Sequence, residues 1–73
     1  MRLTVLSVVK DWTGLIDVTV WVNRKNEYTF TLKTEQDLEE FERLRIHNPG
    51  RALNFLKNNS KNYEKDLDNL NNV

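Results

Sequence analysis

Few side chains in this sequence are suited to catalysis. His47 is the only histidine, cysteine is absent, and the two serines are Ser7 and Ser60. Ser7 falls on the apolar side of a predicted strand and Ser60 at a predicted helix start, so neither can form a nucleophile, base and acid set with His47. We therefore expect a protein that has no catalytic residue and is not an enzyme.

An acidic run could be taken for a metal or acid–base cluster. It consists of Asp37, Glu39, Glu40 and Glu42. These carboxylates follow the outer face of a predicted amphipathic helix, where charged runs are usually solvated. A metal site needs several convergent ligands, which helix-surface carboxylates and a single histidine do not supply. The sequence predicts no metal and no cofactor, and it leaves Glu39, Glu40 and Glu42 as a candidate surface for a protein partner.

Basic residues gather at two places. Arg24 and Lys25 fall in a predicted hairpin loop. The second group surrounds a predicted helix junction and consists of Arg43, Arg45, His47 and Arg51. With the amides of a helix that starts near Pro49, this group could hold an anion, although last-turn cations that complement a helix dipole are ordinary. The chain has 11 basic and 11 acidic side chains, a balance that is not typical of a dedicated nucleic-acid binder.

Aromatic residues are better candidates for binding. Trp12 stands at the predicted tip of the first hairpin, where a large ring has little local role unless it folds over Leu15 or meets a partner. A second apolar cluster, on the predicted outer face of the sheet, consists of Trp21, Leu6 and Val8. The C-terminal segment could cover this cluster through Tyr63 and Leu67, or two copies of the chain could pair there. The functional alternative is a docking surface for another macromolecule.

The elements that position these residues begin with a hairpin. Apolar and polar residues alternate from residue 16 to 22 and again from 28 to 32, which is the strand period. Placing both apolar sets on one face puts Val22 opposite Tyr28 and leaves a three-residue loop with a left-handed residue at Asn26. The same register predicts a pair of threonines across the strands, Thr19 and Thr31.

An earlier strand, residues 3–10, joins this hairpin through the turn at residues 11–14. Asp11 suits the opening of a type I turn, and Gly14 supplies the positive φ at its close. Uniform pairing then puts the small Ser7 opposite Val18 and leaves its two neighbours on the outer face. The result is a meander with one continuous apolar face.

Two helices are expected to follow the sheet. Thr34 and Asp37 have the spacing of a capping box, and Phe41 belongs to the apolar side of the helix that starts there. Asn48 and Pro49 end this helix and suit the start of another, as N-cap and first helical residue. The apolar stripe of the second helix is formed by Ala52, Leu53, Phe55 and Leu56.

Together these elements predict an α+β protein: a three-stranded antiparallel β-meander followed by two α-helices packed on one face. With 73 residues there is room for one small domain, which we assign to residues 1–58. Residues 59–73 are rich in asparagine and form either a short third helix or a frayed tail. The lack of cysteine and of a long apolar run indicates a cytoplasmic protein with no membrane segment.

The second half of this pattern resembles the KTSC domain, a short module of sheet and helices found alone or attached to lysyl-tRNA synthetases. The resemblance covers about residues 16–57 and is carried by Tyr28, Phe30, Gly50, Arg51 and Asn54. This chain departs from the family in having no proline at the first helix start, two extra residues before the Gly-Arg step, and Ala52-Leu53 where aromatics are common. The resemblance implies the same fold and a role near nucleic acid.

These observations favour a small non-catalytic binding module that docks on a protein partner, of the compact kind common among phage and mobile-element products. One alternative is a nucleic-acid-associated module that uses the two basic groups, with Trp21 stacking on bases. Another is a self-associating structural protein, in which the outer sheet face or the edge strands join two copies as a homodimer.

Overall fold

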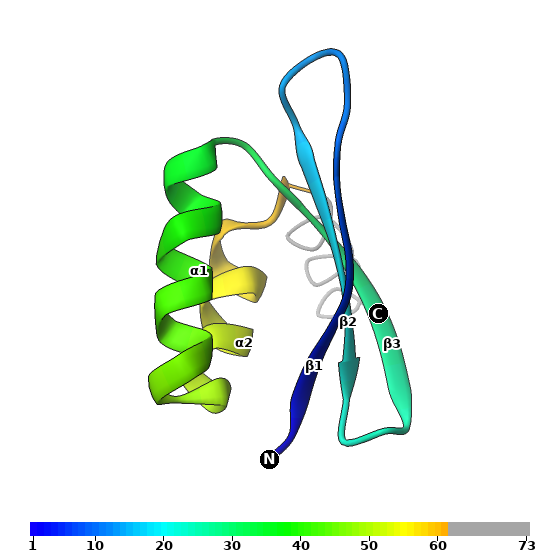
Figure 1. Ribbon diagram of the computed structural model, residues 1–73, viewed down its shortest axis with the longest axis vertical. Helices are drawn as coiled ribbons and strands as arrows, with labels where there is room; N and C mark the ends of the chain where they lie inside the picture. Colours follow the sequence, from blue (N-terminus) through cyan, green and yellow to red (C-terminus); the bar gives the residue numbers. More distant parts are fainter. Residues whose placement is uncertain (62–73) are drawn as a thin grey trace, which may run out of the picture.

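The computed structural model describes residues 1–61, which form one antiparallel sheet with two helices on one of its faces (Figure 1). The strands are β1 (Leu3–Lys10), β2 (Ile16–Val22) and β3 (Asn26–Leu32), and they lie in the order β1-β2-β3. The helices are α1 (Glu35–His47) and α2 (Pro49–Asn59). The predicted α+β meander followed by two helices is therefore confirmed.

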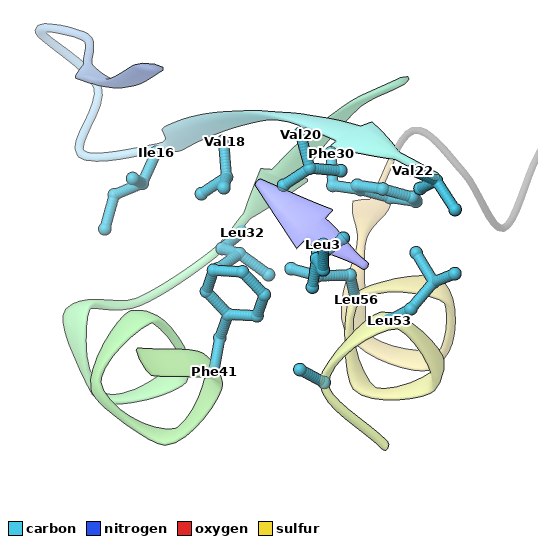
Figure 2. Close-up of a cluster of buried hydrophobic side chains, with 11 residues drawn as sticks. Leu3, Ile16, Val18, Val20, Val22, Phe30, Leu32, Phe41, Leu53 and Leu56 are labelled. Carbon is cyan, nitrogen blue, oxygen red and sulfur yellow. The ribbon is translucent and has the colours of Figure 1, made fainter. Parts of the chain in front are cut away.

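The hydrophobic core lies between the two helices and the sheet face that they cover (Figure 2). The central strand β2 alternates between buried apolar residues and more exposed polar ones, as its period of two predicts. Removal of this apolar surface from water is the main force that holds the helices on the sheet. The buried apolar residues are Leu3, Ile16, Val18, Val20, Val22, Phe30, Leu32, Phe41, Ala52, Leu53 and Leu56.

Both helices begin at the predicted caps. Thr34 Oγ1 accepts a hydrogen bond from the Asp37 amide at 3.1 Å, which satisfies one free N–H of the first turn of α1. Asn48 Oδ1 accepts from the Arg51 amide at 3.2 Å, and Pro49 occupies the first helical position of α2. Thr34, Asn48 and Pro49 thus fix where the chain turns back, and the two helices lie against the same sheet face.

The pairing of β1 with β2 differs from the uniform register. Val5 lies opposite Val20 as predicted, but the register then shifts by one residue, and Ser7 lies opposite Thr19. The extra residue of this β-bulge is Leu6. The shift places Val8 opposite Val18, so the helix-covered face receives Val8 in place of the polar Ser7. The prediction that Val8 lies on the outer face was wrong for this reason.

The pairing of β2 with β3 is displaced by two residues from the prediction. Val22 lies opposite Asn26, and the left-handed residues of the turn are Asn23 (φ 54°) and Arg24 (φ 59°) rather than Asn26. Positive φ at both central positions is the signature of a type I′ turn, which matches the twist of paired strands. A slip of two residues keeps every side chain on its predicted face, so the alternation of apolar residues did not distinguish the two registers.

The displaced register creates polar contacts on the outer face of the sheet. Thr19 Oγ1 lies 3.0 Å from Thr29 Oγ1, so Thr19 faces Thr29 instead of the predicted Thr31. Thr31 Oγ1 donates a hydrogen bond to Asp17 Oδ1 at 2.8 Å.

Ser60, the C-cap of α2, is fully buried, and its Oγ accepts from the Thr31 amide at 3.1 Å. The predicted short helix or frayed tail at 59–73 lies, beyond Lys61, outside the described residues.

Candidate functional site

The loop between β1 and β2 is organised by one side chain. Asp11 Oδ1 accepts hydrogen bonds from the Thr13 amide at 2.9 Å, from Thr13 Oγ1 at 2.5 Å and from the Leu15 amide at 3.1 Å. The backbone adds bonds from the Gly14 amide to Asp11 O at 3.2 Å and from the Asp11 amide to Leu15 O at 2.9 Å. Gly14 has φ 94°, as the predicted turn requires. Five hydrogen bonds therefore hold a loop of five residues.

Trp12 is the second residue of this loop, and its side chain is 96% exposed. It does not fold back over Leu15, so within residues 1–61 nothing packs on the ring. An indole held in solvent by an ordered loop loses little conformational freedom when it binds, since the backbone is already fixed. Of the predicted apolar candidates, Trp12 is the most exposed side chain.

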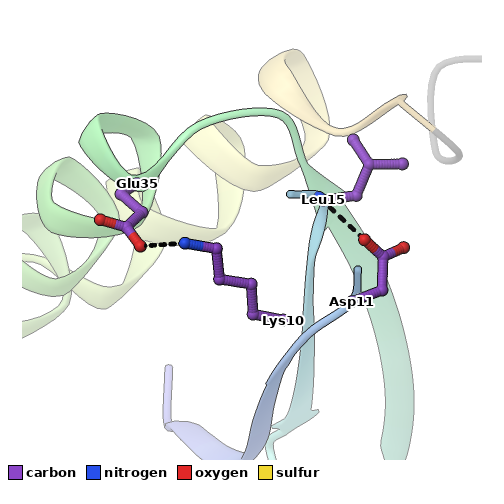
Figure 3. A network of polar contacts seen from close by, with 4 residues as sticks. All are labelled: Lys10, Asp11, Leu15 and Glu35. Atoms are coloured by element: carbon purple, nitrogen blue, oxygen red, sulfur yellow. Dashed lines mark hydrogen bonds and ion pairs between the residues drawn. The ribbon is translucent and has the colours of Figure 1, made fainter. Parts of the chain in front are cut away.

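An ion pair connects this hairpin to the first helix. Lys10 Nζ, in the last residue of β1, contacts Glu35 Oε1 in the first turn of α1 (Figure 3). Both side chains are more than half exposed, so the pair adds little to stability. Its effect is geometric, because it joins the base of the Trp12 loop to the start of α1.

Two carboxyl groups near the loop titrate below their ordinary range. The hydrogen bond from the Thr13 hydroxyl, with those from the loop amides, lowers the pKa of Asp11. The hydrogen bond and the charge of Lys10 lower the pKa of Glu35. Both groups are therefore ionised at neutral pH, in the form in which Asp11 accepts its loop hydrogen bonds.

The predicted outer-face cluster of Trp21, Leu6 and Val8 is not assembled as one surface. Leu6 is the bulge residue and Val8 lies on the opposite face from Trp21. Trp21 is 37% exposed and lies between Thr4 and Glu27 on the neighbouring strands. The exposed apolar residues instead concentrate on the β1 side of the first hairpin, in a group that we call the hairpin apolar group: Leu6, Val8, Val9 and Trp12.

Two of the acidic candidates on α1 form ion pairs with arginines of the same helix. Glu40 pairs with Arg43, and Glu42 pairs with Arg45 at 3.1 Å. Glu39 is exposed and forms no ion pair with any residue of the described chain. A shallow hollow on this helix is lined by Gln36, Glu39, Glu40 and Arg43. All four residues come from α1, so the hollow does not have the enclosure of a small-molecule site.

The basic candidates separate into paired and unpaired groups. Arg43 and Arg45 form the ion pairs just described. Arg24, Lys25 and Arg51 are exposed, and within residues 1–61 none of them forms an ion pair. His47 is exposed at the end of α1, and residues 1–61 contain no group of three acidic, histidine or cysteine side chains that could hold a metal.

Val9 and Ile46 are exposed apolar residues that were not among the sequence-predicted candidates. Val9 is exposed because the bulge turns it to the outer face, opposite Asp17, and a local pattern does not reveal a bulge. Ile46 is 74% exposed in the last turn of α1. The helical spacing of the sequence could have indicated that Ile46 points away from the core. Neither described helix is both long and apolar enough to span a membrane.

Comparison of the chain with known protein families, with curated proteins and with solved structures finds no match. The resemblance to the KTSC domain therefore stays a prediction. Function has to be argued from the surfaces described above.

Proposed function

We propose that this protein is a small non-catalytic module that docks on a protein partner through the hairpin tip that presents Trp12. The observation that carries the proposal is the 96% exposure of Trp12 on a loop closed by the Asp11 carboxylate. Tryptophan is enriched among the few residues that dominate binding energy at protein interfaces. A preordered loop also avoids part of the entropy cost of association.

The surroundings of Trp12 fit a protein partner. The hairpin apolar group continues from the tip along β1, which is an edge strand of the sheet. An edge strand offers backbone donors and acceptors to an added strand, and neighbouring apolar side chains can then fill pockets on the partner. The absence of cysteine from the chain supports the further proposal of a cytoplasmic location.

The test is affinity capture from a lysate of the source cell, with and without nuclease, followed by identification of the bound proteins. Trp12→Ala is compared with Ile46→Ala, which removes an exposed apolar side chain from the end of α1. We expect nuclease-resistant partners to be retained by wild type and by Ile46→Ala and lost with Trp12→Ala. Equal retention by all three proteins would overturn the docking role of Trp12.

The acidic surface of α1 is tested separately. Charge reversal of Glu40 or Glu42 would also break an ion pair within α1, so loss of binding would have two explanations. Glu39→Lys avoids this problem because Glu39 has no ion pair among the described residues. Weaker capture by Glu39→Lys, at an unchanged melting temperature, would extend the docking surface from the hairpin to α1. Unchanged capture would limit it to the hairpin.

A further inference from the structure

Charged residues are unevenly distributed over residues 1–61, the part of the chain that the structure describes. The β2–β3 turn, the start of β1 and the α1–α2 junction lie at one end, and the Trp12 hairpin tip lies at the other (Figure 1). The segments at the first end, residues 1–5, 20–28 and 43–54, hold six lysine or arginine residues and one acidic residue, Glu27. The rest of residues 1–61 holds four basic and seven acidic residues. We call the first end the basic end.

Three cations of the basic end are brought together by the register of the sheet. The Arg2 amide donates to Asn23 Oδ1 at 2.9 Å, and the Asn23 amide donates to Arg2 O at 2.8 Å. Arg2 therefore lies beside the type I′ turn that holds Arg24 and Lys25, and the bond from the Lys25 amide to Val22 O at 3.0 Å closes that turn. In the part of the chain that the structure describes, Arg2, Arg24 and Lys25 form no ion pair.

The helix junction adds a fourth cation, Arg51. Val22, just before the turn, and Leu53, in the first half of α2, lie at the same end of the core (Figure 2). Arg51 precedes Leu53 by two residues, is exposed and has no ion pair among residues 1–61.

An aromatic ring borders the same end. Trp21 lies two residues before Asn23, on the sheet face away from the helices, and is partly exposed. Guanidinium groups match the geometry of phosphate, and an aromatic face accepts a stacked base of any sequence. Neither described helix carries a row of lysine and arginine at helical spacing, which entry of a helix into a duplex groove would need.

We propose that the basic end binds single-stranded nucleic acid, with backbone phosphates on Arg2, Arg24, Lys25 and Arg51 and a base stacked on Trp21. The site is separate from the proposed docking tip at Trp12 and does not depend on it. Glu27 lies directly across from Trp21 and opposes the approach of a phosphate there, so it limits the affinity.

The first experiment is fluorescence anisotropy with a labelled oligothymidine of about 20 nucleotides, a length that exceeds the site of a small domain. Four phosphate contacts predict that log K falls with log salt with a slope of about −3. Arg24→Glu/Lys25→Glu should weaken binding at least about tenfold, and Arg24→Ala/Lys25→Ala should weaken it less. Glu27→Gln should strengthen it. Circular dichroism checks that each variant is folded.

The matched control keeps the net charge of the double variant but moves the change away from the site. Lys33→Glu/Lys61→Glu alters two exposed lysines that lie outside the three basic segments. The proposal requires that this control bind the oligothymidine nearly as wild type does. Equal weakening by both double variants would mean that only net charge matters, and it would overturn the site.

The stacking step has its own readout. In a Trp12→Phe background Trp21 is the only tryptophan, and oligothymidine should quench its fluorescence at the same concentrations that raise the anisotropy. Trp12→Ala should leave nucleic-acid binding unchanged, so failure of the docking proposal and failure of this one are distinguishable. A duplex of equal length that binds as tightly, or vesicles of phosphatidylserine or a polyglutamate that compete at equal charge, would overturn the assignment to single strands.

Discussion

Asp11 and Leu15 are joined by two hydrogen bonds that run in opposite directions. The Leu15 amide donates to the Asp11 carboxylate at 3.1 Å (Figure 3). The Asp11 amide donates to the Leu15 carbonyl at 2.9 Å. Both bonds join Asp11 and Leu15, the first and last residues of the loop, and Trp12 lies between these two residues in the sequence. The exposure of Trp12 is therefore set by the loop itself and not by packing against the rest of the protein.

Removal of the Asp11 carboxylate should loosen the presentation of Trp12. Asp11→Ala leaves the Thr13 and Leu15 amides without the acceptor that the carboxylate provides. We expect a lower free energy of unfolding in urea and faster local motion of Trp12 in time-resolved anisotropy. Asp11→Asn, which keeps an acceptor oxygen, is the control. Equal behaviour of the alanine and asparagine variants would contradict the role of the hydrogen bonds.

Acidification should weaken the loop before it unfolds the core. The pKa values of Asp11 and Glu35 are lowered in the folded protein, by hydrogen bonds to Asp11 and by the contact of Glu35 with Lys10. The stability that they contribute is thus present above the ordinary carboxyl range near pH 4 and is lost as pH falls through the folded values. The Thr13 and Leu15 amide signals in NMR should shift in that window. The Asp11→Asn variant should lack this titration at both amides.

The type I′ turn makes opposite predictions for two substitutions. Arg24 has φ 59°, where glycine has no steric penalty, so Arg24→Gly should raise the free energy of unfolding by up to about 1 kcal/mol. Asn23→Val places a β-branched residue at φ 54° and removes the acceptor for the Arg2 amide, so it should cost about 2 kcal/mol. Urea denaturation measures both. Stabilisation by Asn23→Val would contradict the observed register and favour the turn predicted at Asn26.

Phe41 should be costly to truncate, and more so than Phe55. It is fully buried between α1 and the sheet (Figure 2), so Phe41→Ala should cost about 3–5 kcal/mol. Phe55 is only partly buried against the same core, and Phe55→Ala should cost clearly less. Thermal unfolding gives the ranking, and Phe41→Leu keeps the comparison measurable if the alanine variant does not fold. Equal losses for Phe41→Ala and Phe55→Ala would contradict the core described here.

The sequence predicted the faces of the elements better than their registers. The alternation of apolar and polar residues in β2 and β3 predicted that Val18, Val20 and Phe30 are buried. This prediction was correct because the face on which each residue lies does not depend on its partner in the next strand. The pairing slipped by two residues because both registers bury the same set, and the preference of Asn23 for positive φ decided between them. The bulge at Leu6 was not predicted. Either Ser7 or Val8 could lie opposite Val18, and the alternation in β1 alone does not show which of them does.

The candidate sites also differ in how well the sequence predicts them. Trp12 could be predicted because a hairpin tip is local, and the turn chemistry of Asp11 and Gly14 marks it. The two basic groups were also predicted from the sequence, but their placement at one end together with Arg2 was not, because these cations come from three separate segments and only the fold brings the segments to one end. Counting charge along the chain gave a balance of zero, which concealed the separation of charge in space.

Because the Asp11 loop is closed by its own hydrogen bonds and Trp12 takes no part in the core, position 12 is free to change without redesign of the rest of the chain. Selection or protein engineering can therefore alter the chemical identity of the tip while the scaffold stays the same. A library of variants at this position should consist mostly of folded proteins that differ only in the side chain presented at the tip.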